Sequence, residues 1–98
     1  MAARTRYLLA YDIRDQRRLR RVHRVATDFG DPLQYSLFIC DLTPVELARM
    51  KALLIEEMKT TEDSVSIFDL GPPSGRGVEC IESIGRRRRL PASGAEIW

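Results

Sequence analysis

The segment from Tyr7 to Arg24 (YLLAYDIRDQRRLRRVHR) constrains the fold of this chain more than any other stretch. It opens on an apolar run, Tyr7 to Tyr11, that ends at the carboxylate of Asp12. A continuous apolar run bounded by charge predicts a central strand that is covered on both faces. The strand therefore delivers one acid to the start of a strongly basic segment, which contains Arg14, Arg17, Arg18, Arg20, Arg21 and Arg24.

The basic segment has the periodicity of an amphipathic helix. From Arg17 to Phe29, apolar residues recur at steps of three and four, which predicts one buried stripe with arginines around the other faces. Asp15 is a candidate second metal ligand, but its position before the first turn favours a helix N-cap. Gly30 is expected to end the helix as its C′ residue.

The rest of the chain alternates between strand-like and helical patterns. Asp31-Pro32 predicts a turn, and 33–42 an extended segment that bends near Gln34-Tyr35. Thr43-Pro44-Val45-Glu46 is a capping box that begins a second helix. A strand over 64–70, a Gly- and Pro-rich loop over 71–75 and a last short strand over 78–84 follow.

This order of elements predicts an α+β fold. We expect a ferredoxin-like βαββαβ sandwich, with two helices on one face of a mostly antiparallel sheet and a short extra C-terminal strand, Val78 to Ile84. Residues 1–85 would form this single domain, and 86–98 a basic C-terminal tail. In the tail, Arg86 to Arg89 would contact DNA backbone and Ile97-Trp98 would dock on a partner, or the tail has no role.

The net charge of +2 conceals a strong polarity along the chain. Residues 1–27 carry eight Arg and two Asp, a balance of +6, whereas 28–85 balance to −7 and 86–98 to +3. Fourteen of the sixteen cations are arginine, whose planar fork holds phosphate oxygens in pairs. The clusters favour a polyanion-binding surface, and the other interpretation is a genome rich in arginine codons.

Several function classes find no support in the sequence. No apolar run approaches the length of a membrane span, and the N-terminus lacks the pattern of a signal peptide. Cys40 and Cys80 match no zinc or redox spacing, so we expect buried free thiols and a cytoplasmic protein. His23 is the only histidine and is expected to be neither ligand nor base, and Tyr35 is expected in the core or an interface rather than as a base platform.

Six motifs occur in order between about Tyr7 and Gly85. They are a strand ending Tyr-Asp-Ile, an Asp and an Arg pair opening the first helix, a helix ending in Gly, a Gln-Tyr-Ser-x-Phe strand, a Leu-Thr-Pro-x-Glu capping box and an Asp-Ser-Val-x-Ile strand. Together they resemble the CRISPR-associated Cas-two family, small endonuclease-like proteins of spacer acquisition.

The resemblance implies a ferredoxin-like homodimer with Mg²⁺-dependent phosphodiesterase activity on RNA or duplex DNA. It also implies a role beside the Cas-one integrase in capturing foreign DNA. The metal-binding, catalytic aspartate carries over to Asp12, and Tyr11, Arg17, Arg18 and Phe38 match further positions of the family's site. We expect Arg14, Arg17, Arg18 and Arg21 to hold nucleic acid.

One difference from the family pattern concerns the strand leading to Gln34. The family often carries a basic residue there, whereas this chain has Pro32 and Leu33. Two alternatives to a nuclease of CRISPR adaptation stay open: a non-enzymatic DNA-binding scaffold with Asp12 as a vestigial metal site, or a toxin-like ribonuclease of the same fold with no CRISPR role. Mg²⁺ needs only one or two acids, and a two-fold axis beside Asp12 would bring the Asp12 of a second chain close and double the ligand set.

Overall fold

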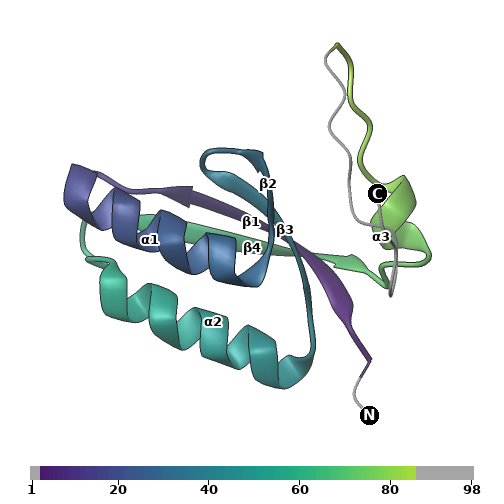
Figure 1. Cartoon of the computed structure of the whole chain (residues 1–98), viewed down its shortest axis with the longest axis horizontal. Coiled ribbons are helices and arrows are strands. Elements are labelled where there is room, and N and C mark those ends of the chain that lie inside the picture. The colour runs from purple at the N-terminus through teal and green to yellow at the C-terminus, as the bar shows by residue number, and fades with distance from the viewer. Residues whose placement is uncertain (1–2, 86–98) are drawn as a thin grey trace.

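The computed structural model of the chain describes residues 3–85, so the predictions for the 86–98 tail concern residues outside the described part. The elements form a βαββαβ unit followed by one short helix (Figure 1). In chain order they are β1 (Thr5–Asp12), α1 (Gln16–Phe29), β2 (Asp31–Gln34), β3 (Leu37–Leu42), α2 (Pro44–Glu57), β4 (Ser64–Gly71) and α3 (Arg76–Glu79).

The strands form one antiparallel sheet in the order β2-β3-β1-β4. β1 is therefore internal, with β3 on one side and β4 on the other, and β4 is an edge strand. Leu8 illustrates the register, since it lies opposite Ile39 of β3 and Phe68 of β4. This arrangement confirms the predicted ferredoxin-like fold.

The two long helices lie side by side across one face of the sheet (Figure 1). Both begin as the sequence predicts: Asp15 Oδ2 accepts a hydrogen bond from Arg18 N, and Thr43 and Glu46 form the reciprocal capping box. The core lies between the helices and the sheet. Its buried residues include Leu9 and Tyr11 of β1, Val22, Val25 and Ala26 of α1, Phe38 and Cys40 of β3, and Met50 and Leu54 of α2.

Gly30 ends α1 for a steric reason. Its φ of −162° is extended backbone that any residue adopts, so the backbone conformation does not require glycine here. A Cβ here would collide with the carbonyl oxygen of Ile39 and with Cys40 Sγ. Glycine thus allows the end of α1 to approach β3 closely. Burial raises the pKa of the Cys40 thiol to about 12, and the nearby Asp41 and Asp31 carboxylates add to the effect.

The turn into β2 is placed wrongly by the sequence pattern. Asp31 and Pro32 open β2, opposite Ile39 and Phe38, and the turn is at Tyr35-Ser36, where the predicted bend of the 33–42 segment is confirmed. Proline fits here because β2 is an edge strand, where a missing N–H need not interrupt the ladder.

The predicted strand Val78 to Ile84 is also wrong within the described residues. Val78 belongs to α3, and 80–84 form no strand there. Helical hydrogen bonds run from Val78 N to the Gly75 carbonyl and from Cys80 N to the Arg76 carbonyl. Gly77 is buried against Arg6, which leaves no room for a side chain at this contact. Cys80 is half-buried rather than buried, and both cysteines are free thiols.

In the described part of the chain, 3–85, no helix combines the length and apolar character needed to cross a bilayer.

Candidate nucleic-acid interface and carboxylate site

Asp12 stands at the end of β1 with its side chain exposed. Alternate side chains of a strand face opposite sides of the sheet. Leu9 and Tyr11 face the helices and are buried in the core, so Asp12 faces the other side. Its strand neighbour is Ser64 of β4. Among residues 3–85, nothing donates a hydrogen bond to the Asp12 carboxylate or pairs with its charge, so its oxygens are available to an external cation.

The carboxylate alone is an incomplete metal site. Within the residues described, no group of three or more His, Cys, Asp or Glu side chains is arranged to hold a metal ion. Mg²⁺ binds through one or two carboxylates and keeps several waters, or takes further oxygens from phosphate. Asp12 therefore fits Mg²⁺ as one ligand, and the remainder must come from water, a phosphate or a second chain.

Asp63 holds the loop that follows Asp12, and the sequence analysis missed it. Its buried carboxylate accepts a hydrogen bond from Arg14 N at 2.9 Å and from Lys59 N at 2.8 Å. Arg18 donates to the same carboxylate through Nε at 2.7 Å and Nη2 at 3.1 Å. These bonds, the Arg18 contact foremost, hold the pKa of Asp63 well below its ordinary value. Asp63 thus ties together the β1–α1 loop, α1 and the turn before β4.

This network gives Arg18 a different role from the one predicted. Besides the two bonds to Asp63, its Nη2 lies 3.0 Å from Glu62 Oε1. The hydrogen bond to Asp63 raises the pKa of the Arg18 guanidinium, and the one to Glu62 adds to the rise. The guanidinium is therefore used inside the protein, and Arg18 positions the loop. The only sequence signal for this network was the acid pair Glu62-Asp63 directly before β4.

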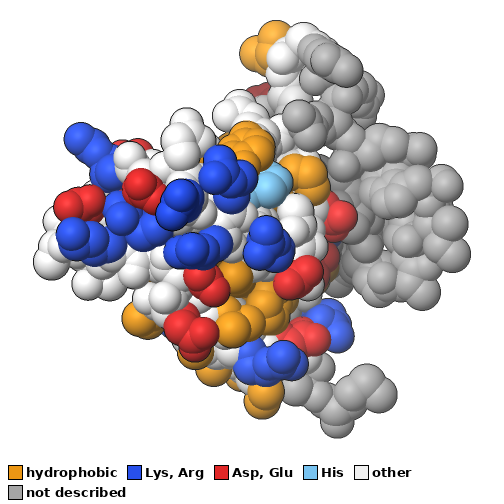
Figure 2. All heavy atoms as spheres, turned by 60° about the vertical axis from the view of Figure 1, so that its left-hand side comes forward, with side chains coloured by type: hydrophobic (Ala, Val, Ile, Leu, Met, Phe, Trp, Pro, Cys, Tyr) orange, Lys and Arg blue, Asp and Glu red, His pale blue; other side chains and the backbone are white. Residues whose placement is uncertain are grey.

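The other helix arginines form an exposed stripe. Spacings of three, four and seven residues place side chains on one helix face. Arg17, Arg20, Arg21 and Arg24 have this spacing, and all four are exposed; we call them the arginine stripe. Figure 2 shows blue side chains gathered on this part of the surface. Arg14 is also exposed and lies in the loop beside Asp12. Of the residues predicted to hold nucleic acid, Arg14, Arg17 and Arg21 are thus accessible.

Tyr11 and Phe38 lie beneath this surface as packing residues. Phe38 is fully buried and Tyr11 is 7% exposed, and their ring centroids lie 6.3 Å apart. The Tyr11 hydroxyl donates to the Tyr35 carbonyl at 2.5 Å. Burial raises the pKa of Tyr11, and the neighbouring Tyr35 adds to the rise. Tyr11 therefore stays protonated and joins β1 to the β2–β3 turn.

The carboxylate and the arginine stripe lie on different sides of the sheet. Asp12 faces away from the helices, whereas Arg17 and Arg21 belong to α1, which covers the opposite face. Arg14 follows Asp12 by two residues, so its backbone lies near the end of β1. One nucleic acid that touches both regions must therefore pass around the end of the sheet at Asp12.

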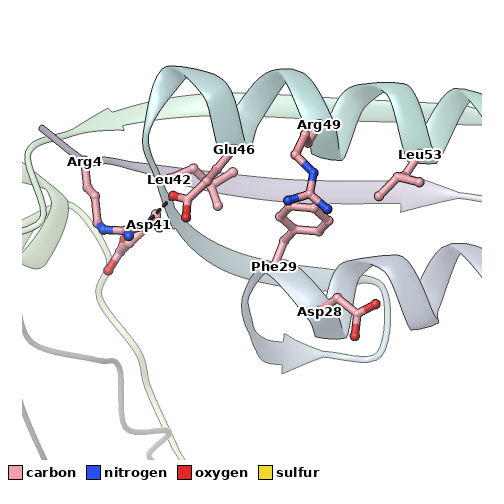
Figure 3. A pocket seen from close by; sticks show the side chains of 8 residues that line it. All are labelled: Arg4, Asp28, Phe29, Asp41, Leu42, Glu46, Arg49 and Leu53. Carbon is pink, nitrogen blue, oxygen red and sulfur yellow. Dashed lines mark hydrogen bonds and ion pairs between the residues drawn. The ribbon is translucent and has the colours of Figure 1, made fainter. Parts of the chain in front are cut away.

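A pocket of about 430 Å³ lies near the other end of β1, between α1, α2 and β3 (Figure 3). Three of its charged groups, Arg4, Asp41 and Glu46, already serve the fold. Glu46 completes the capping box and pairs with Arg4, and Asp41 is held by the guanidinium of Arg6 through two hydrogen bonds, at 2.7 and 2.8 Å. This pocket is therefore a poor candidate for the main site.

Comparisons with known proteins agree on one family. The family described as "CRISPR associated protein Cas2" matches residues 5–75. A relative from Thermodesulfovibrio yellowstonii, named CRISPR-associated endoribonuclease Cas2 2, is 45% identical over 94% of each chain. One from Geobacter sulfurreducens, named CRISPR-associated endoribonuclease Cas2, is 44% identical over 82% of this chain and 83% of its own. The crystal structure of Streptococcus pyogenes Cas2 superposes with a TM-score of 0.72 at 28% identity, covering 82% of this chain and 99% of that one.

Proposed function

This chain belongs to the CRISPR-associated Cas2 family, and we propose that it is a nucleic-acid-binding homodimer of CRISPR adaptation with a Mg²⁺-dependent endonuclease site at Asp12. Relatives at 44% and 45% identity carry the name endoribonuclease, which supports phosphodiester cleavage as the activity. The observation that carries the proposal is the free Asp12 carboxylate at the rigid end of an internal strand.

In this proposal, Asp12 binds the metal ion and the nearby arginines bind phosphates. Mg²⁺, when bound at Asp12, would stabilise charge on the scissile phosphate and lower the pKa of a water molecule. Arg14 would hold a phosphate beside it, because its backbone is fixed by Asp63 while its side chain is exposed. The arginine stripe would hold further backbone phosphates, which positions a nucleic acid without reading its sequence.

Three features support a homodimer. A chain of 98 residues gains stability by burying more surface in a partner. Phe68 is 51% exposed and shares with Asp12 the sheet face that α1 and α2 leave uncovered. At this site, residues 3–85 of one chain supply a single carboxylate, and a two-fold axis beside Asp12 would supply the second. The partners would be a second copy, the Cas-one integrase and spacer DNA, with RNA as a further substrate.

A purified Asp12→Asn variant tests the enzymatic half of this proposal. Asparagine keeps the size of the side chain and removes the charge that holds a cation, so we expect Mg²⁺-dependent cleavage of RNA and DNA probes to fall to background. Binding to the same probes should stay within about twofold, because the arginine stripe is untouched. Cleavage by the variant at the parent rate would contradict the assignment of Asp12.

A non-enzymatic scaffold is the second candidate function. It is favoured by the single carboxylate and by the position of the arginine stripe away from Asp12. On this alternative, the parent protein shows no Mg²⁺-dependent cleavage, and Asp12→Asn supports spacer integration with the Cas-one integrase at the parent rate. Loss of both cleavage and integration in the variant would instead favour a nuclease that adaptation requires.

A further inference from the structure

Tyr35 lies in the β2–β3 turn and is 51% exposed. Its ring stacks face to face on the imidazole of His23, with centroids 3.9 Å apart and an interplanar angle of 2°. Since one face of the ring lies against His23, the exposed part of Tyr35 is available to a second flat ring.

Hydrogen bonds and a ring contact of His23 hold the Tyr35–His23 stack in place. His23 Nδ1 lies 3.1 Å from the Tyr35 carbonyl and 3.0 Å from the Tyr11 hydroxyl, which itself donates to that carbonyl. A carbonyl only accepts hydrogen bonds, so the tautomer with its proton on Nδ1 lets His23 donate to Tyr35. The imidazole also meets the buried Phe38 ring edge-on, at 5.4 Å and 69°. Tyr35 therefore projects from a rigid base, and little side-chain entropy is lost when a ligand stacks on it.

Arginine side chains of α1 lie near the Tyr35–His23 stack. Arg20 precedes His23 by three residues, so the two are neighbours on the surface of α1. Figure 2 shows the single histidine of the chain, in pale blue, at the edge of the blue arginine side chains. A nucleotide whose phosphate contacts the arginine stripe would have its base within reach of Tyr35.

We propose that Tyr35, backed by His23, is a stacking platform for an unpaired nucleobase of the nucleic acid held by the arginine stripe. Aromatic rings beside cations bind single strands in this way, because every base has a π-face. A paired base is already stacked in its helix, so the platform would prefer a frayed end or a single-stranded extension. This inference rests on the proposed nucleic-acid binding and adds a preference for unpaired ends.

The test compares two fluorescein-labelled DNA duplexes of about 20 base pairs, one blunt and one with single-stranded thymine ends, by fluorescence anisotropy. The parent should bind the extended duplex more tightly. Tyr35→Ala should remove that preference, at a cost of about tenfold in affinity for the extended duplex, and leave blunt-duplex binding within about twofold. Tyr35→Phe, which keeps the ring, should behave as the parent does.

Two measurements separate stacking from a loss of structure. A 2-aminopurine at the first unpaired position should be quenched by the parent and by Tyr35→Phe but not by Tyr35→Ala, because quenching requires ring contact. The control is Ile55→Ala, which removes another exposed apolar side chain, on α2, and should change neither affinity nor quenching. Unchanged quenching in Tyr35→Ala would overturn the platform while leaving the arginine stripe intact. Failure of the parent to bind either duplex would overturn both proposals.

Discussion

At the scale of single residues, the buried acid Asp63 explains how an exposed acid is held in place. Asp63 accepts hydrogen bonds from Arg14, Lys59 and Arg18, whereas the Asp12 carboxylate has no such donor among residues 3–85. The pair thus contrasts an acid that stabilises the fold with one that the proposed function assigns to a metal ion. A satisfied acid fixes the loop, and a free acid at its edge is left for a ligand.

Asp63→Asn should destabilise the protein and loosen the loop after Asp12. Asparagine lacks the charge that holds the Arg18 guanidinium, and its amide cannot accept all four hydrogen bonds. We expect Tm to fall by at least about 5 °C, measured by circular dichroism. Glu62→Gln is the matched control, since Glu62 pairs with the same arginine at the surface; its Tm should change by less than half as much. Equal effects from the two variants would contradict the role of Asp63.

Gly30→Ala tests a second single position, through a purely steric effect. The backbone there is extended, so the added methyl group costs nothing in φ, but it would collide with the Ile39 carbonyl and with Cys40 Sγ. We expect a loss of about 1–3 kcal/mol in the free energy of unfolding, measured in urea. Asp28→Ala, at an exposed position of the same helix end, should cause no loss. A fully stable Gly30→Ala would show that α1 and β3 separate easily.

At the scale of elements, α1 combines a core face, a structural arginine and the arginine stripe, to which the proposed function assigns phosphate binding. Val22, Val25 and Ala26 are buried against the sheet, and Arg18 is used by Asp63. Only the arginine stripe remains for an external polyanion. Counting all the arginines of α1 as ligands would therefore overestimate the binding charge.

Arg17→Gln and Arg21→Gln should each weaken nucleic-acid binding and reduce its dependence on salt. Each phosphate that a protein neutralises on a duplex contributes about 0.9 to the slope of log affinity against log salt, so each substitution should make the slope shallower by about that amount. The weakening should be the same for unrelated sequences, because phosphate contacts carry no sequence information. Arg49→Gln, an exposed arginine of α2 outside the stripe, should leave the slope unchanged. An equal change from Arg49→Gln would place the binding surface elsewhere.

Elements with local signals could be predicted from the sequence. The box of Thr43 and Glu46 contains its own hydrogen-bond partners within four residues, and so does the cap at Asp15. The strand expected over 78–84 was wrong because alternation says nothing about whether a partner strand exists, and Gly77 packs on Arg6 instead. The roles of Arg18, Asp63 and His23 depend on residues 12 to 49 positions away, which no local pattern contains.

At the scale of the whole molecule, several acids are more acidic in the folded chain than in the unfolded one. Hydrogen bonds lower the pKa of Asp63 (from Arg18), of Asp15 (from the Arg18 backbone) and of Glu46 (from the Thr43 backbone). A lowered folded pKa contributes stability that is complete above the ordinary carboxyl pKa and is lost as the pH falls through the folded value. The free energy of unfolding should therefore decline steadily from about pH 5 to about pH 3.

Urea titrations at a series of pH values would measure this decline, and Asp63→Asn identifies its main source. Since asparagine does not titrate, the decline should be shallower in this variant than in the parent. A parent whose stability is flat across the same range would contradict the assignment of these acids as hydrogen-bond acceptors in the folded state.

The homodimer and the Asp12 site make a joint prediction, because a shared site requires both carboxylates. Parent and Asp12→Asn chains, mixed in equal amounts and allowed to exchange, give about one quarter parent dimers and one half mixed dimers. If each site needs two Asp12 carboxylates, only parent dimers cleave, and the Mg²⁺-dependent rate should fall to about one quarter. If each chain acts alone, the rate should fall to about one half.

Exchange is verified by mass spectrometry of differently tagged chains. As a control, Ile55→Ala in place of Asp12→Asn should leave the rate unchanged. A rate of one half would remove the physical reason for placing Asp12 beside the two-fold axis, since a metal held by one carboxylate, water and phosphate would then suffice.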